Sequence, residues 1–160
     1  MTRVWVSAGT NVDPERNLRA AIHNLQREFG ELVLSPVYQT KAMGFEGDDF
    51  LNMVIGIDTE LLPDQVRIRL RKIEAQQGRV RGEEKFSPRA IDLDLLTWGD
   101  LVDESQDIPR DEILHYAFVL RPLVDVAGAE KYPGTNDSYQ RLWRRFQGQK
   151  KGMFPLDWEW

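Results

Sequence analysis

The sequence predicts an α+β fold of the ferredoxin-like sandwich type, in which a mostly antiparallel sheet is covered by helices. Segments with strand-like alternation and segments with helical spacing follow one another in the order strand, helix, strand, strand, helix, strand. The chain has 160 residues, of which 41% are hydrophobic, so a single domain over residues 1–160 can bury a core of its own.

The first strand and the first helix have the clearest signals. Residues 3–8 alternate in the manner of a strand that ends at a Gly-Thr-Asn turn. Asp13 as N-cap and Pro14 in the first turn are typical of a helix start, and Gly30 is typical of its end. The apolar residues between them recur at helical spacing: Leu18, Ile22, Leu25 and Phe29.

The next segments predict two strands and a second helix. Residues 32–40 and 50–58 read as strands, and the loop between them is longer than a tight hairpin needs, which is common where a loop binds a ligand. The helix begins at Pro63, with an apolar stripe of Val66, Leu70 and Ile73, and ends near Gly78. A neighbouring polar stripe of Arg67, Arg71 and Glu74 is more often a solvated face with helix ion pairs.

The run Ala90-Ile91-Asp92-Leu93-Asp94-Leu95-Leu96 predicts a strand with two carboxylates on one face. A period of two puts Asp92 and Asp94 together, opposite the large aliphatic residues. Such a pair is usually solvated surface. However, like charges repel and Asp is a poor strand former, and a bound cation would resolve that conflict. Mg²⁺ is the natural candidate, and the cation-rich loop just upstream suits a nucleotide polyphosphate that carries the metal.

The rest of the chain is less informative. An acidic loop leads to Pro109, residues 116–120 form a short loop that enters a helix at Pro122, and a last helix is expected from about Asp137 to Gln147.

Composition excludes several functions. The net charge of −5 argues against general binding to nucleic acid or to an anionic membrane, whereas the cations concentrated between Arg67 and Arg89 favour a small anionic ligand. The chain has no cysteine, which excludes disulfides and thiolate chemistry and fits a reducing cytoplasm. The apolar run after Arg3 is too short for a signal peptide, and no stretch approaches the length of a membrane span.

Several motifs, in order along nearly the whole chain, resemble the 6-hydroxymethyl-7,8-dihydropterin pyrophosphokinase family of folate biosynthesis. The central one is Arg89-x-x-Asp92-Leu93-Asp94-Leu95-Leu96, and the others are Gly9-Thr10-Asn11, Tyr38-x-Thr40, Phe50-Leu51-Asn52, Glu74-x-Gln76-x-Gly78-Arg79-x-Arg81 and Phe118-Val119-Leu120-x-Pro122-Leu123. The resemblance implies a cytoplasmic, monomeric enzyme that transfers the β,γ-diphosphate of ATP to the pterin hydroxymethyl group and releases AMP.

The resemblance also implies roles for individual residues. Asp92 and Asp94 would hold two Mg²⁺ ions, and together with Arg79 and Arg89 they would be the catalytic residues. The nucleotide would be bound by Arg71, Glu74, Arg81, Lys85, Phe86, Arg89 and Leu95. Arg110 could substitute for a nucleotide contact that the family ordinarily has in the segment matching residues 109–116. The pterin would be bound by Thr40, Met43, Phe50, Asn52 and Phe118. Phosphoryl transfer depends on placement and charge neutralisation, so two metals and several arginines can serve without His or Cys.

The chain departs from the family pattern in places, and three alternatives stay open. Residues 109–116 replace a segment that ordinarily offers a His after the proline and an Arg two positions before Phe118. The chain could therefore be a diverged paralogue that acts on a related pterin. A metal-dependent nucleotidyl transferase would need a further acidic residue, for which there is no clear candidate. A non-catalytic ferredoxin-like nucleotide-binding module would leave the Asp pair unexplained.

Overall fold

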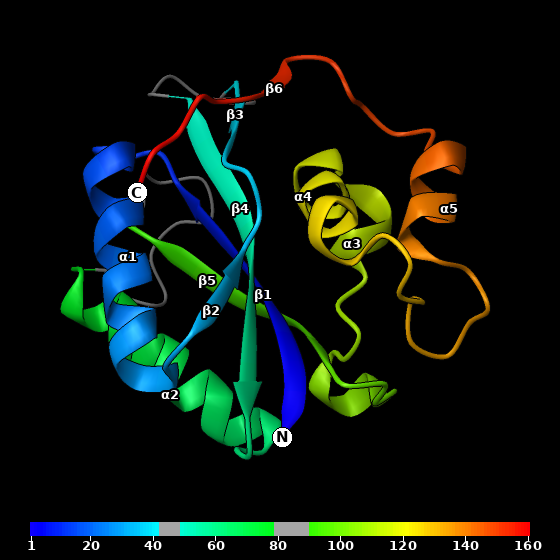
Figure 1. Ribbon diagram of the computed structural model, residues 1–160, viewed down its shortest axis with the longest axis horizontal. Helices are drawn as coiled ribbons and strands as arrows, with labels where there is room; N and C mark the ends of the chain where they lie inside the picture. The colour runs from blue at the N-terminus through cyan, green and yellow to red at the C-terminus, as the bar shows by residue number, and fades with distance from the viewer. Residues whose placement is uncertain (42–48, 79–89) are drawn as a thin grey trace.

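The centre of the protein is an antiparallel sheet of six strands. The computed structural model describes residues 1–41, 49–78 and 90–160 (Figure 1). The strands are β1 (Thr2–Thr10), β2 (Leu32–Leu34), β3 (Tyr38–Thr40), β4 (Phe50–Thr59), β5 (Asp92–Trp98) and β6 (Met153–Pro155). Their order is β5-β1-β4-β3-β6, and β2 pairs with β4 beside β3. The predicted ferredoxin-like α+β fold is confirmed.

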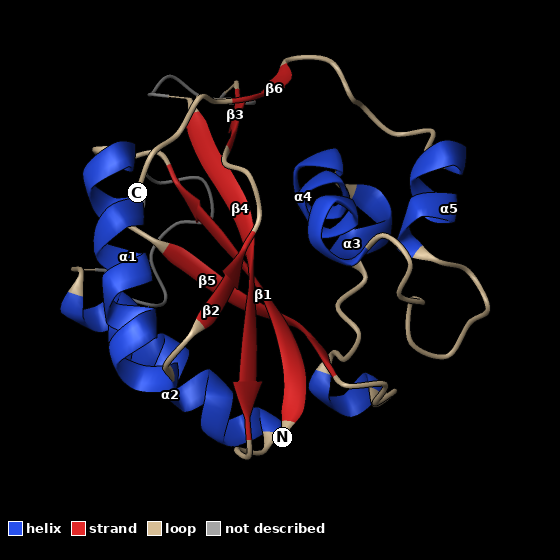
Figure 2. Ribbon diagram, in the orientation of Figure 1, coloured by secondary structure: helices blue, strands red, loops and turns tan. Residues whose placement is uncertain are grey.

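Helices cover both faces of the sheet (Figure 2). On one face lie α1 (Pro14–Phe29) and α2 (Pro63–Gln76), and on the other lie α3 (Glu112–His115), α4 (Ala117–Ala127) and α5 (Tyr139–Arg145). A short 3-10 helix, η1 (Glu104–Gln106), follows β5. The core accordingly has two parts, because each face of the sheet buries its own set of apolar side chains. None of the helices in the described ranges is long and apolar enough to cross a membrane.

The alternation predicted around the Asp pair is confirmed. Ile91, Leu93 and Leu95 are buried in the core on the side of α1 and α2. Leu96, like Trp5 and Val54, belongs to the core on the side of α4. The side chains of Asp92 and Asp94 follow this second face, beyond the part that the helices cover.

The segment predicted as one strand over residues 32–40 is divided into β2 and β3. Ser35 lies in the gap, where its N–H donates to the Val54 carbonyl at 3.0 Å and its Oγ accepts from the Val54 N–H at 2.8 Å. A side-chain oxygen thus replaces a main-chain partner of β4 while Pro36, which has no N–H, interrupts the ladder. After the break, β3 pairs with β4 in a register that puts Tyr38 opposite Asn52 and Thr40 opposite Phe50.

The ends of three helices differ from the prediction. Helix α4 begins at Ala117, so the predicted loop over residues 116–120 that enters a helix at Pro122 is wrong. Asp13 occupies the predicted N-cap position of α1, but its backbone is left-handed, with φ of 38°, and its side chain makes no capping hydrogen bond. Pro14 does begin the helix and Gly30, with φ of 80°, ends it. The last helix is shorter than predicted, since it is capped by Ser138 and ends before Phe146.

The C-terminal segment crosses the end of the sheet, which the sequence did not indicate. Strand β6 pairs with β3, and the Leu156 N–H donates to the Val37 carbonyl at 2.8 Å. The chain then reaches α1 (Figure 1). There the Arg19 guanidinium carbon lies 4.5 Å from the centroid of the Trp158 ring.

Candidate active site

The residues that carry the motifs meet in one row across the sheet. Strand β1 lies between β5 and β4. Its Gly9 pairs with Asp92 of β5 on one side and with Asn52 of β4 on the other. Neighbouring strands lie about 4.8 Å apart, so the predicted metal and pterin residues are separated by roughly 10 Å. A Cβ at Gly9 would come within 2.9 Å of Asn52 Oδ1. The glycine therefore leaves space beside the Asn52 amide that any other side chain would fill.

Asp94 lies two residues from Asp92 along β5, opposite Ser7, and its pKa is strongly shifted. Its side chain is only 16% exposed. Burial, followed by the charge of Asp92, raises the pKa of Asp94 to about 6, and Glu112 acts in the same direction. The cations Arg110 and Arg71 lower it and only partly compensate. Carboxylates that are crowded and desolvated in this way have a strong electrostatic reason to bind a cation.

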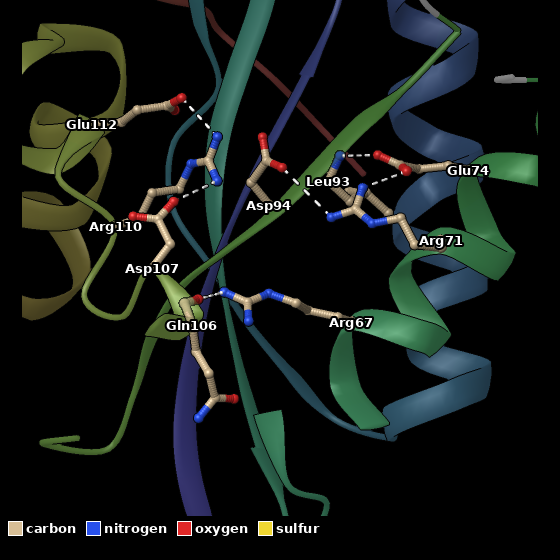
Figure 3. Close-up of polar contacts among 9 residues, drawn as sticks. All are labelled: Arg67, Arg71, Glu74, Leu93, Asp94, Gln106, Asp107, Arg110 and Glu112. Carbon is tan, nitrogen blue, oxygen red and sulfur yellow. Dashed lines mark hydrogen bonds and ion pairs between the residues drawn. The ribbon is translucent and has the colours of Figure 1, made fainter. Parts of the chain in front are cut away.

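The polar stripe of α2 lies against the edge of β5, so its interpretation as a solvated face was wrong (Figure 3). Glu74 is 1% exposed, and its Oε2 accepts from the Leu93 N–H at 2.8 Å. Arg71 Nη1 donates to Glu74 Oε1 at 2.5 Å, and its Nη2 lies 3.6 Å from Asp94 Oδ1. Arg67 donates to the Gln106 carbonyl beyond the strand.

Arg110 approaches Asp94 from the opposite side (Figure 3). Its N–H donates to the Leu96 carbonyl at 2.9 Å, which fixes its main chain beside β5. Its guanidinium donates to Glu112 at 2.8 Å and to Asp107 at 3.3 Å. Burial alone would lower the pKa of Arg110, but the bond to Glu112 and the charge of Asp94 outweigh it, so the pKa is raised and the group stays cationic.

Three of the predicted pterin residues, Thr40, Phe50 and Asn52, lie on the β4 side of Gly9. Asn52 is 8% exposed, and its Nδ2 donates to Thr40 Oγ1 at 2.9 Å. Phe50 pairs with Thr40 in the same ladder. Phe118 is in the first turn of α4, where it stacks on Tyr116 with ring centroids 5.1 Å apart.

A hydrogen-bonded clamp joins α4 to this half of the sheet. The Tyr38 hydroxyl donates to Asp125 at 2.5 Å, and Arg121 donates to the other oxygen of Asp125 at 2.5 Å. Burial, together with the bond to Asp125, raises the pKa of Tyr38. The clamp therefore holds the helix that carries Phe118 over the strands that carry Asn52.

The remaining predicted site residues lie either outside the described ranges or in the core. Arg79, Arg81, Lys85, Phe86, Arg89 and Met43 lie outside the described residues. The Leu95 side chain is buried in the core on the face opposite the aspartates, so only its main chain is available to a nucleotide.

The sequence reasoning missed three residues that shape the site. Gly9 was noted only as part of a motif, Glu112 adds a negative charge near Asp94, and Tyr116 supports Phe118. Residues 116–120 were predicted to form a loop, and a loop pattern does not show which of its side chains stack. Tyr116 precedes the helix and has an extended backbone, which allows the stack.

The donor set fits magnesium. Within residues 1–41, 49–78 and 90–160, no three acidic or histidine side chains are close enough to hold an ion alone. Mg²⁺ is typically held by one or two carboxylates, with water and substrate phosphates as its other ligands. Asp92 and Asp94 match that requirement.

Comparisons with known proteins agree with this geometry. The model of the 7,8-dihydro-6-hydroxymethylpterin-pyrophosphokinase family matches residues 5–128. A 2-amino-4-hydroxy-6-hydroxymethyldihydropteridine pyrophosphokinase from Pseudomonas aeruginosa is 36% identical over 140 residues, which cover 82% of this chain and 84% of the relative. The folate synthesis bifunctional protein of Arabidopsis thaliana is 31% identical over 161 residues, covering 98% of this chain and 33% of the relative.

A solved structure shares the fold. Wild-type HPPK-DHPS of Plasmodium falciparum superposes with a TM-score of 0.70 at 13% identity, covering 91% of this chain. This chain spans only 44% of that longer protein. The family match, the identity over most of the chain and the shared fold lead to one conclusion. This chain belongs to the 7,8-dihydro-6-hydroxymethylpterin-pyrophosphokinase family.

Proposed function

We propose that the row formed by Asp92, Gly9 and Asn52 is the floor of the site at which this chain transfers the β,γ-diphosphate of ATP to the hydroxymethyl group of 6-hydroxymethyl-7,8-dihydropterin, releasing AMP. The chain is an ATP-dependent diphosphotransferase of folate biosynthesis. The observation that carries the assignment of the site is the pairing of Gly9 with both Asp92 and Asn52, since it brings the acidic pair and the predicted pterin contact onto one face.

The chain's residues act mainly by placement and by neutralising charge. Two Mg²⁺ ions held by Asp92 and Asp94 would neutralise the negative charge on the phosphate oxygens of ATP. That charge would otherwise repel the attacking pterin hydroxyl. Arg71 and Arg110 approach Asp94 from its two sides, so both are placed to meet phosphates that lie over the acidic pair. A bidentate guanidinium suits that task better than an ammonium group.

The nucleotide contacts include residues outside the described ranges. Arg79 and Arg89 act on the phosphates in this proposal, together with Arg81 and Lys85, and Phe86 contacts the nucleotide. The support for them is their place in the family motif and the positive charge of the segment.

In this proposal the pterin binds between aromatic side chains and forms a hydrogen bond with the side-chain amide of Asn52. The bond from Asn52 Nδ2 to Thr40 fixes the amide so that Oδ1 lies over Gly9, toward the acidic pair. That oxygen can accept from the donor edge of the pterin, while Phe50, Phe118 and Met43 contact its flat faces. A monomeric state and a cytoplasmic location stay predictions.

The test is the identity of the product. Purified protein with ATP and Mg²⁺ should form AMP only when 6-hydroxymethyl-7,8-dihydropterin is added, and Asp94→Asn should form almost none. Quantification of nucleotides by ion-exchange chromatography distinguishes AMP from ADP. Release of ADP, or no turnover by folded protein with this pterin, would contradict the assignment; turnover with another pterin would identify a paralogue.

A further inference from the structure

At the outer edge of β5, the buried carboxylate of Glu74 accepts a hydrogen bond from the main chain. Strand β5 ends the sheet, and an edge strand turns a row of N–H groups away from its only neighbour. The Leu93 N–H belongs to that row and donates to Glu74 Oε2 at 2.8 Å. Leu93 lies between Asp92 and Asp94, so this bond fixes the main chain at the midpoint of the pair.

The other oxygen of Glu74 leads back to the same pair. Glu74 Oε1 accepts from Arg71 Nη1 at 2.5 Å, and Arg71 Nη2 lies 3.6 Å from Asp94 Oδ1 (Figure 3). Glu74 is therefore linked to Asp94 by two routes. One runs through the main chain of β5 at Leu93, and the other through the guanidinium of Arg71. A flexible Arg side chain alone would not keep that orientation, because it has many rotamers to lose.

Direct binding of the nucleotide by Glu74 does not fit this arrangement. Its side chain is 1% exposed, and each of its oxygens is engaged by a protein donor. A role in stability alone is also a poor explanation, since buried ion pairs are weak contributors to stability compared with apolar residues of similar volume.

We infer that Glu74 is a positioning residue, which sets the spacing and orientation of Asp92 and Asp94 before the metal and nucleotide bind. This inference rests on the proposed function of the two aspartates. It also assigns Arg71 a role in the free protein, as the link between Glu74 and Asp94.

The variant Glu74→Gln tests the inference, because it keeps the shape and removes the charge. We expect Mn²⁺ affinity, measured by electron paramagnetic resonance with a non-hydrolysable ATP analogue, to fall about ten- to a hundred-fold, as for loss of charge-assisted hydrogen bonds. We expect kcat to fall while the KM for the pterin is unchanged. The Leu93 amide should exchange faster in the metal-free protein.

A matched control is available on α1, which packs against α2. Glu28 accepts from Arg69 and Lys72 of α2 at 3.0 Å each, and these contacts are remote from the edge of β5. Glu28→Gln should therefore change stability without changing Mn²⁺ affinity. If Glu74→Gln fails to fold, Arg71→Lys provides the second test: it keeps the charge but cannot bridge two carboxylates, and Mn²⁺ affinity should fall several-fold.

The outcomes separate this inference from the proposed function. Unchanged Mn²⁺ affinity and unchanged Leu93 exchange in Glu74→Gln would overturn the positioning role, even if AMP is formed normally. Weaker binding of ATP in EDTA, with metal affinity intact, would show that Glu74 contacts the nucleotide instead. If the Leu93 amide exchanges faster in Glu74→Gln but the wild type itself binds no Mn²⁺ with nucleotide, the fixed strand edge stands and the proposed metal site is refuted.

Discussion

Replacing Asp94 with Asn should stabilise the metal-free protein while it abolishes turnover. Asp94 is largely buried beside Asp92, and its ionisation is therefore costly in the folded state. The amide of Asn has nearly the same shape but no charge to desolvate or repel. The same substitution removes a proposed metal ligand, so activity and stability should change in opposite directions.

The magnitude follows from the pKa of Asp94. It rises from the ordinary 3.8 to about 6, and this rise already includes the opposing attraction of Arg110 and Arg71. Each pKa unit corresponds to about 1.4 kcal/mol, so ionised Asp94 costs on the order of 2–3 kcal/mol at neutral pH. For a domain of this size, relief of that cost should raise the Tm by roughly 5–10 °C.

The effect should depend on pH with a defined sign. An acid with a raised folded pKa contributes stability below its unfolded pKa and loses it as the pH rises through the folded value. The wild type should therefore lose stability from about pH 4 to about pH 6 relative to Asp94→Asn. The two proteins should unfold alike below about pH 4 and differ most above about pH 6.

Urea unfolding in EDTA at pH values from 4 to 7.5 measures this difference. Asp58→Asn is the control of opposite sign, because the hydrogen bond from Arg3 at 2.8 Å lowers the pKa of Asp58. That variant should be less stable than wild type at neutral pH and equal to it in acid. A strongly destabilised Asp94→Asn that still forms AMP would refute the reasoning and make the acidic pair structural.

Three further predictions concern the floor and wall of the site. Asn52→Leu should weaken pterin affinity about ten- to a hundred-fold, measured by titration with an ATP analogue bound, and should leave ATP affinity alone; equal pterin affinities would remove Asn52 from the pocket. Gly9→Ala should lower pterin affinity as well, because its Cβ would lie 2.9 Å from Asn52 Oδ1, and an unchanged Kd in the same titration would show that the amide moves aside at no cost. Arg110→Ala should raise the Kd for ATP with little change for the pterin, and calorimetry that finds no difference would exclude Arg110 from the nucleotide site.

Local sequence patterns were enough for most of the fold. Strand alternation placed the core faces of β1 and β5, and helical spacing placed the buried stripes of α1 and α2, because both periods follow directly from backbone geometry. The patterns did not show the break at Ser35, which depends on a hydrogen bond to Val54 in another strand. Nor did they show β6, whose pairing with β3 requires the chain to return from α5.

For the site, the sequence identified the residues that are proposed to carry the chemistry. The order of the motifs identified Asp92, Asp94 and Asn52, and period two placed the acidic pair on one face. Only the tertiary structure decided what surrounds them. Glu74, read along its helix, belonged to a solvated stripe, yet it is buried against the edge of β5. Arg110 could be named only as a substitute for a missing residue, until the loop after β5 placed it beside Asp94. The physical reason is that burial and the charges around Asp94 come from elements remote in sequence, and no local period encodes which of them will meet.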